Sequence, residues 1–251
     1  MTVHYESDGA VVTITIDNPA TANAVNLETA KALAEAFSRF DADPELSVAI
    51  LTGANNKFCA GGDLKAIASG QGTIVVTEDG DGPLGPSRMM LSKPVIAAVE
   101  GHAVAGGLEL ALCCDLRVAA RNATFGVYCR RWGVPLCDGG TVRLPRLIGM
   151  SRALDMILTG RGVSGEEAFE MGLANRLCEP GQALEVSREL AESLARLPQS
   201  CMLSDRRSAY EQWNMTLDEA LANETRRGLE VIRSPEMIQS VRQWAASRPN
   251  N

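Results

Sequence analysis

Apolar and polar residues follow two different periods in the first part of the chain. Val11–Ile16 alternates with a period of two, which predicts a strand with one buried face. After a turn at Asn18-Pro19, a helical period starts at Asn26, whose side chain is a good N-cap, and stops at Asp43-Pro44. The apolar side chains predicted to share one side of this helix are Leu27, Ala30, Leu33, Phe37 and Phe40.

Short, continuous apolar runs follow at residues 48–51 and 94–99, and both are typical of strands buried on two faces. The first leads into a glycine-rich turn at residues 58–65, and the second leads into another at residues 100–110. Each turn opens into a run with helical character. With a further strand expected at residues 116–119, the chain up to about residue 150 is predicted to consist of repeated β/α units.

Helical signals replace strand signals after about residue 140. Ser164 with Glu167, and Thr216 with Glu219, have capping-box spacing. We expect a core domain at residues 1–195 and a C-terminal helical region at residues 196–251. Residues 70–85 are rich in Gly, Asp and Thr without a helical period, so we expect a mobile surface loop there.

Charge and cysteine content narrow the partners and the compartment. A net charge of −7 over 251 residues argues against nucleic acid or an anionic membrane as the main partner, and favours a small ligand. No apolar run approaches the roughly 20 residues of a membrane span, and the first residues do not resemble a signal peptide. Seven cysteines, two of them adjacent, indicate thiols in a reducing compartment, so we expect a cytoplasmic protein. With two histidines and no CxxC pair, we expect no metal site.

The two glycine turns are the first candidates for chemistry. Gly61-Gly62 and Gly106-Gly107 leave the backbone free to approach a ligand closely. If the N–H groups of Gly62 and Gly106 converge on one carbonyl oxygen, they form an oxyanion hole. The helix expected at residues 108–114 would add the positive end of its dipole. The alternative for the first turn is a strand-to-helix connection capped by Asp63.

Two carboxylates lie beside these turns or near them. Glu109 falls in the first turn of an apolar helix, where it is either a charge partner for the helix end or an acid/base group. Asp138 lies in a Gly- and Pro-rich loop at residues 133–141, where it either caps the next helix or supplies a second carboxylate. Six arginines between residues 130 and 161 form a solvated face or ion pairs, or else they bind phosphate groups of a ligand.

Taken together, these segments resemble the crotonase, or enoyl-CoA hydratase/isomerase, superfamily. The matching segments are residues 23–26, 58–65, 100–115, 125–126, 133–143, 159–161 and 168–173. The resemblance implies an α/β fold, built as a crotonase-type spiral of ββα repeats with a C-terminal helical region for oligomerisation and lid formation. It implies trimers or dimers of trimers, acyl-CoA thioesters as substrates in fatty acid metabolism, and no cofactor, since CoA is part of the substrate.

The resemblance also assigns roles to single residues. Gly62 and Gly106 match the two backbone donors that hold the thioester oxygen, and Glu109 matches the first of two hydratase glutamates. The second glutamate is replaced by Cys129, whose thiol, with a pKa of about 8.5, is a poor substitute for a carboxylic acid. The residues that match the CoA-binding region are Ala24, Lys57, Ala60, Asp63 and Leu64.

We therefore expect an enoyl-CoA hydratase, a lyase that adds water across trans-2-enoyl-CoA. Glu109 is expected to be the main acid/base, with Asp138 as its partner and Cys129 near the acyl chain. The alternatives are an enoyl-CoA isomerase, another lyase or hydrolase of the superfamily, and an acyl-CoA-binding protein whose catalytic pair has decayed at Cys129.

Overall fold

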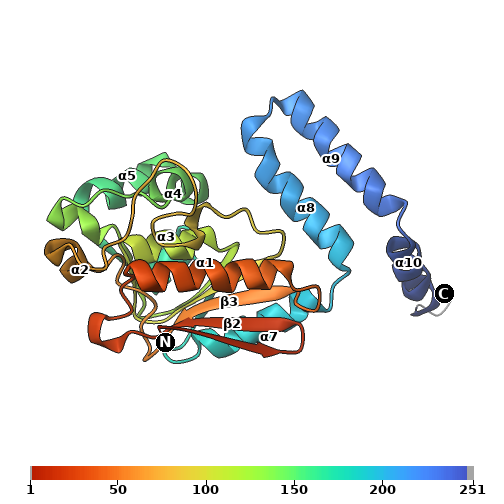
Figure 1. Cartoon of the computed structure of the whole chain (residues 1–251). Coiled ribbons are helices and arrows are strands. Elements are labelled where there is room, and N and C mark those ends of the chain that lie inside the picture. The colour runs from red at the N-terminus through yellow and green to blue at the C-terminus, as the bar shows by residue number, and fades with distance from the viewer. Residues whose placement is uncertain (1, 248–251) are drawn as a thin grey trace. The chain divides into compact units, whose positions relative to one another are not determined.

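The structure, a computed structural model, describes residues 2–247 (Figure 1). It divides into two compact units that meet in the sequence between Glu192 and Ser193, close to the boundary expected after residue 195. All described strands belong to the first unit. The second unit contains the helices α8 (Gln199–Glu211), α9 (Leu217–Ile232) and α10 (Pro235–Ser247). None of the helices in residues 2–247 combines the length and the apolar character needed to cross a membrane.

Six strands of the first unit form one sheet in the order β1-β2-β3-β4-β6-β9. The pair β1 and β2 is antiparallel and every other pair is parallel. The strands are β1 (Val3–Asp8), β2 (Val11–Ile16), β3 (Val48–Gly53), β4 (Val95–Val99), β6 (Leu116–Ala120) and β9 (Arg176–Cys178). The four predicted strands are confirmed, and β4 is buried along its whole length, as a continuous apolar run predicts. The prediction of a single buried face for β2 is wrong, because Val11 and Thr13 are buried as well as Val12, Ile14 and Ile16.

A second sheet has three short strands, β5 (His102–Val104), β7 (Thr124–Gly126) and β8 (Gly162–Ser164), in the order β5-β7-β8. The chain passes from β4 in the large sheet to β5 in the small sheet and then into α3 (Gly106–Cys113). It makes the same passage from β6 to β7 before it reaches α4 (Gly140–Ile148). The predicted ββα repeat is therefore present.

The helices begin where polar side chains cap them. Asn26 accepts a hydrogen bond from Thr29 N at 2.9 Å at the start of α1 (Leu27–Ala42), as predicted. Asp63 caps α2 (Leu64–Ser69), and Thr216 with Glu219 forms a complete capping box on α9. The remaining helices are α5 (Met150–Thr159), α6 (Gly165–Glu170) and α7 (Ala183–Ala195).

The capping box predicted at α6 is only half formed. Ser164 accepts a hydrogen bond from Glu167 N at 3.1 Å, but the Glu167 carboxylate pairs with Arg161 Nη2 at 2.6 Å. The guanidinium offers the carboxylate a charged partner in place of a backbone N–H. The second glycine segment differs slightly as well, since α3 begins at Gly106 and ends at Cys113 instead of spanning residues 108–114.

Arg117 fixes the C-terminal end of α3. Its side chain is 2% exposed, and its guanidinium donates to Ala111 O at 3.3 Å, Cys114 O at 2.7 Å and Leu173 O at 2.6 Å. The positive charge lies where the helix dipole is negative and where helix carbonyls lack partners. The N-terminal end of α3, which carries Gly106 and Glu109, is thus part of a helix held firmly from behind.

The segment before β4 is less exposed than predicted. Residues 71–81 are mostly exposed and form no helix or strand, but residues 82–87 are buried. Leu84 is 1% exposed, and the backbone at Gly85 lies so close to Ala30 that a Cβ there would be 2.3 Å from the Ala30 carbonyl oxygen. The prediction of a surface loop is therefore wrong for residues 82–85, because close backbone packing buries them.

Gly107 is expected to tolerate no side chain. A Cβ at this position would lie 2.1 Å from the Cys59 carbonyl oxygen, which belongs to the backbone and cannot rotate away. We expect Gly107→Ala to lower the free energy of unfolding by about 2–4 kcal/mol. As a control, Gly228→Ala in α9, where nothing lies within 4 Å, should raise it by about 0.5–1 kcal/mol. Urea unfolding followed by circular dichroism measures both, and wild-type stability in Gly107→Ala would contradict the packing.

Candidate active site

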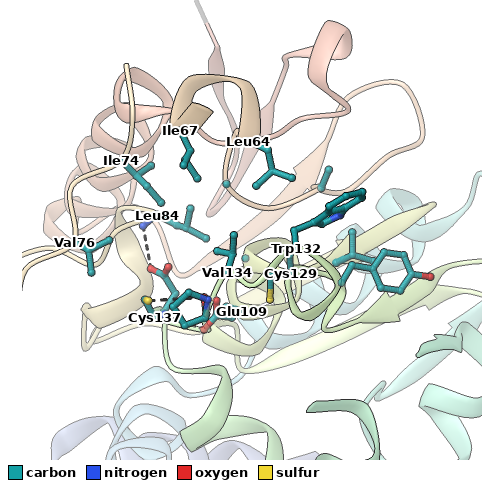
Figure 2. A pocket seen from close by; sticks show the side chains of 18 of the residues that line it. Leu64, Ile67, Ile74, Val76, Leu84, Glu109, Cys129, Trp132, Val134 and Cys137 are labelled. Atoms are coloured by element: carbon teal, nitrogen blue, oxygen red, sulfur yellow. Dashed lines mark hydrogen bonds between the residues drawn. The ribbon is translucent and has the colours of Figure 1, made fainter. Parts of the chain in front are cut away.

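A cavity of about 470 Å³ lies in the first unit (Figure 2). Its lining comes from four stretches of the chain, within residues 60–67, 73–84, 104–109 and 128–138. Both glycine segments and the loop at residues 133–141 therefore contribute to one pocket.

The two glycine segments run side by side as backbone. Cys59 N donates to His102 O at 2.8 Å, and Val104 N donates to Cys59 O at 3.1 Å. At Gly61, where φ is +97°, a Cβ would lie 2.8 Å from Gly106 N. Only glycine combines this φ with so close an approach, so the sequence pattern is explained by the contact between the segments.

Two backbone donors are left without protein partners at this junction. Within residues 2–247, neither Gly62 N–H nor Gly106 N–H donates a hydrogen bond to the protein, and both residues line the cavity. An ideal Cβ on Gly106 would lie 3.4 Å from Gly62 N, so the two donors are neighbours. Ala105 adopts φ 53° and ψ −125°, a conformation that costs a residue with a side chain on the order of 1–3 kcal/mol and that sets the direction of the Gly106 peptide.

Glu109 reaches the cavity from the first turn of α3. Its side chain is buried, and Oε1 accepts hydrogen bonds from Asp138 N and Gly140 N, each at 2.8 Å. Burial raises the pKa of Glu109 from 4.5 to about 7, against the opposing effect of these backbone donors, and the negative charge of Asp138 adds to the rise. The second oxygen, Oε2, carries neither bond. Glu109 is thus a carboxyl group that changes its charge near neutral pH.

Asp138 also lines the cavity and is only 4% exposed. Its Oδ1 accepts hydrogen bonds from Leu84 N at 3.0 Å and from the Ser87 hydroxyl. Burial raises the pKa of Asp138, while Ser87, Leu84 and two arginines act in the opposite direction. Its side chain does not cap α4, whose N-cap is Gly139, so the alternative of a simple helix cap is wrong.

Sequence reasoning missed the two residues that hold Asp138 in place. Ser87 binds its carboxylate, and Arg143 donates to Asp138 O at 2.8 Å and to Ser87 O at 2.6 Å. The sequence pattern identifies Arg143 only as one of six arginines between residues 130 and 161. In the structure, four others of that group also bind backbone carbonyls, so much of the basic stretch is structural: Arg130, Arg131, Arg152 and Arg161.

Cys129 lines the same cavity with a side chain that is nearly buried. Burial raises the pKa of its thiol, and the neighbouring Glu109 charge acts in the same direction. Cys129 therefore presents a neutral S–H group to the pocket. Figure 2 shows its sulfur and the Glu109 carboxylate in the same part of the cavity. The resemblance predicts Cys129 at the site, whereas no sequence pattern points to Trp132 and Cys137, which share the lining.

The residues expected to bind CoA lie in two adjoining strips beside the cavity. Ala60 N donates to Ala22 O at 3.2 Å, and Val25 pairs with Gly62, which joins the strip containing Ala24 to the strip at residues 57–64. Asn23 Nδ2 donates to Lys57 O at 2.6 Å across the same junction. Ala60 and Leu64 line the cavity itself, whereas Ala24, Lys57 and Asp63 are not among its lining residues.

The arrangement combines two unpaired N–H donors with a carboxyl group that titrates near neutrality. The donors can stabilise negative charge on an oxygen, and the carboxyl group can take up or return a proton. Within residues 2–247, no three His, Cys, Asp or Glu side chains gather in a group that could hold a metal ion.

Known proteins resemble the chain along its whole length. Residues 6–250 match the family model described as Enoyl-CoA hydratase/isomerase. The enoyl-CoA hydratase EchA19 of Mycobacterium tuberculosis is 37% identical over 255 residues, which cover 98% of this chain and 94% of that protein. A carnitinyl-CoA dehydratase of Salmonella typhi is 43% identical over 198 residues, which cover 76% of this chain and 74% of that protein.

Solved structures agree with this result. The enoyl-CoA hydratase EchA1 from Mycobacterium marinum has a TM-score of 0.92 and 39% identity, and the match covers 100% of this chain and 98% of that one. An enoyl-CoA hydratase from Mycobacterium tuberculosis H37Rv has a TM-score of 0.93 and 38% identity over the same shares. The predicted crotonase-type α/β fold is confirmed.

The electrostatic cost of Glu109 predicts a variant that is more stable than the wild type. Because its pKa rises from 4.5 to about 7 on folding, the folded state favours the protonated form, and stability falls as pH rises through this range. Glu109→Gln keeps an oxygen acceptor without the charge. We expect it to raise the free energy of unfolding by roughly 3 kcal/mol at pH 8 and by about 1 kcal/mol or less at pH 5.

Urea unfolding at the two pH values measures this effect. The matched control is Glu100→Gln, another buried carboxylate that accepts a backbone N–H, here from Ala183 at 2.9 Å, but lies outside the cavity lining. Because Glu100 accepts its backbone N–H outside the cavity, this control reports the effect of replacing a buried carboxylate by its amide. A Glu109→Gln protein that is less stable than the wild type at pH 8 would contradict the assignment.

Proposed function

The chain belongs to the enoyl-CoA hydratase/isomerase family, and on that premise we propose that it is a lyase that reversibly hydrates trans-2-enoyl-CoA thioesters. One observation carries the proposal: the unpaired N–H groups of Gly62 and Gly106 share a cavity with the buried carboxyl group of Glu109. The two N–H groups can donate to a thioester carbonyl oxygen, and the carboxyl group can take a proton from a water molecule.

The two glycines act on the thioester oxygen. When water attacks Cβ, electrons move through the double bond to the carbonyl, and the oxygen becomes the negative end of an enolate. Gly62 and Gly106 donate to that oxygen more strongly in the transition state than in the substrate, which is the condition for catalysis. The loss of one such donor typically lowers the rate by about 10²–10³-fold.

Glu109 carries out the proton transfers as general base and general acid. In its ionised form it takes a proton from the attacking water, whose oxygen bonds to Cβ, and the enolate then accepts a proton at Cα. With a pKa of about 7, Glu109 is both a usable base and a usable acid at neutral pH. Since the Cys129 thiol remains neutral, we propose that Glu109 serves both transfers and that Asp138 is its partner, raising the proton affinity of Glu109 through its charge.

The CoA portion of the substrate is proposed to lie along the two strips beside the cavity. Ala60 and Leu64 offer small or apolar surface, the buried Ala24 belongs to the adjoining strip, and the exposed Lys57 offers a positive charge for a phosphate group. Asp63 positions the strip by capping α2. No cofactor is required in this scheme, because CoA arrives as part of the substrate.

The relative named carnitinyl-CoA dehydratase suggests a second direction for the same chemistry. Removal of water from a 3-hydroxyacyl thioester uses the same enolate, the same donors and the same carboxylate in reverse order. The identity with that relative is 43%, compared with 37% for EchA19, which favours dehydration as a second candidate function. Because Cys129 replaces a second carboxylate, three alternatives remain as outcomes of the experiments below. They are isomerisation, another lyase or hydrolase reaction, and acyl-CoA binding without catalysis.

Assembly and compartment are also proposed. The second unit exposes large apolar side chains along α9 and α10, including Leu217 at 74% and Trp244 at 58%, which supports a role in forming a trimer or a dimer of trimers. All seven cysteines are unpaired, which supports a reducing, cytoplasmic location.

Hydration itself is tested with Glu109→Gln. Wild-type enzyme should consume the conjugated thioester of crotonyl-CoA, measured as the loss of its ultraviolet absorbance and as 3-hydroxybutyryl-CoA by mass spectrometry. Glu109→Gln should lower kcat by at least about 10³-fold while thioester affinity changes little, because the amide cannot accept a proton. Glu100→Gln should retain kcat within about threefold. Full activity in Glu109→Gln would exclude the mechanism.

The pH dependence tests the ionisation of Glu109. Because the ionised form is the base and its pKa is about 7, kcat/KM for hydration should fall about tenfold per pH unit below that value. Asp138→Asn removes a charge that raises the pKa of Glu109, so the profile should move to lower pH. A profile that is flat between pH 5 and pH 8, or one that moves upward in Asp138→Asn, would contradict this assignment.

A further inference from the structure

The cavity is larger and more apolar than a short acyl chain requires. We propose that the substrates of this enzyme carry a bulky apolar acyl group, of about eight carbons or more, and that Trp132 is a specificity-determining residue for that group. The inference rests on the proposed function, since it names the acyl class that the hydratase site accepts. Three observations carry it: the composition of the cavity wall, its volume and the exposure of the apolar residues at its mouth.

The wall offers very little to a polar acyl group. Among the described lining residues, Glu109 and Asp138 are the only charged ones, and Oδ1 of Asp138 is already engaged by Leu84 N–H and Ser87. Glu109 is assigned to proton transfer. Thr73 and Tyr128 add two hydroxyl groups, and the rest of the side-chain surface is aliphatic, aromatic or thiol. Beyond Cβ, where Glu109 acts, a charged group on the acyl chain would lose its hydration without a charged partner, whereas an alkyl or alicyclic group would gain from burial.

The volume also exceeds the needs of a short chain. If each carbon with its hydrogens occupies about the volume of a water molecule, roughly 30 Å³, a four-carbon crotonyl group fills about 120 Å³. The cavity holds about 470 Å³. Even with room for the sulfur and the nearest part of pantetheine, a crotonyl group leaves much of the space unfilled. A group of about eight to ten carbons, at roughly 240–300 Å³, fits better.

The mouth of the cavity keeps large apolar side chains in contact with solvent. Trp132 is 72% exposed, Leu64 is 45% exposed and Ile67 is 40% exposed, yet all three line the cavity. They come from two separate elements, α2 and the 3-10 helix Tyr128–Trp132. Figure 2 shows the indole of Trp132 and the side chain of Leu64 projecting toward the same space. An apolar surface continuous with a reaction site is suited to cover the outer part of a long acyl chain.

Trp132 can be singled out because its segment is anchored. Gly133 N donates to Arg130 O at 3.4 Å and Val134 N donates to Cys129 O at 3.2 Å, and Arg131 lies 3.8 Å from the Tyr128 ring centroid. The backbone that carries Trp132 is therefore tied to the cavity floor at Cys129, while the indole itself is exposed. A broad aromatic face on a fixed backbone adds apolar contact at low conformational cost.

The test compares enoyl-CoA substrates of four, six, eight and ten carbons. Wild-type kcat/KM should rise by about two- to fourfold for each added methylene as the chain fills the cavity. Trp132→Ala should lower kcat/KM for the ten-carbon substrate by about tenfold or more and change the four-carbon value by less than about threefold. Trp132→Phe should recover part of the loss. Leu158→Ala, an equally exposed apolar residue on α5 at 69% that does not line the cavity, is the matched control and should show no dependence on chain length.

The outcomes separate this inference from the proposed function. A four-carbon substrate that is turned over as efficiently as the ten-carbon one, or an equal loss at all lengths in Trp132→Ala, would overturn the inference and leave the hydratase assignment standing. If no enoyl-CoA is hydrated, the hydratase assignment fails, and calorimetry with decanoyl-CoA and butyryl-CoA decides the inference. Tighter binding of decanoyl-CoA, lost in Trp132→Ala, would support it, and equal binding would overturn it.

Discussion

The site depends on a backbone-to-backbone contact that excludes side chains. At Gly107 a Cβ would meet the Cys59 carbonyl oxygen at 2.1 Å, and at Gly61 it would meet Gly106 N at 2.8 Å. Because two segments about 45 residues apart in sequence touch at this depth, each can leave one N–H group unpaired at the same point. Unpaired buried donors cost free energy, and the proposed function accounts for that cost by giving both donors a thioester oxygen as acceptor. Arg117 supports the arrangement from the far end of α3.

The second constraint is electrostatic. Glu109 and Asp138 are two acids in a largely apolar cavity, and no cation lines that cavity within the described residues. Glu109 is held by the backbone N–H groups of Asp138 and Gly140, and Asp138 by Leu84 N–H and the Ser87 hydroxyl. Dipoles in place of a full counter-charge leave the proton affinity of Glu109 high. The backbone donors favour the ionised form, so it is burial, with the charge of Asp138 acting in the same direction, that keeps the pKa of Glu109 near neutrality.

Much of this site could be predicted from sequence, and the limits have physical causes. Gly62, Gly106 and Glu109 are found because glycine pairs between apolar runs, and a carboxylate inside one, are strong local signals. The three-residue strands β5, β7 and β8 are not predicted, because so few positions do not show a hydrophobic period. Ser87, Arg143 and Trp132 escape because their roles depend on which distant loops meet, and no local pattern records that. The burial of residues 82–85 escapes for the same reason.

The hydrogen bonds from Leu84 N and Ser87 to Asp138 link the shape of the cavity to the charge state of Glu109. Residues 73–84 contribute to the cavity wall and so shape the space open to a ligand, while Asp138 influences the charge state of Glu109. A substitution or insertion that reshapes this segment for a new substrate will also disturb the anchor of Asp138. Under the proposed function, a change of this segment toward new acyl groups will therefore shift the pH dependence of the reaction as well, unless Ser87 and Leu84 keep their hydrogen bonds to Asp138.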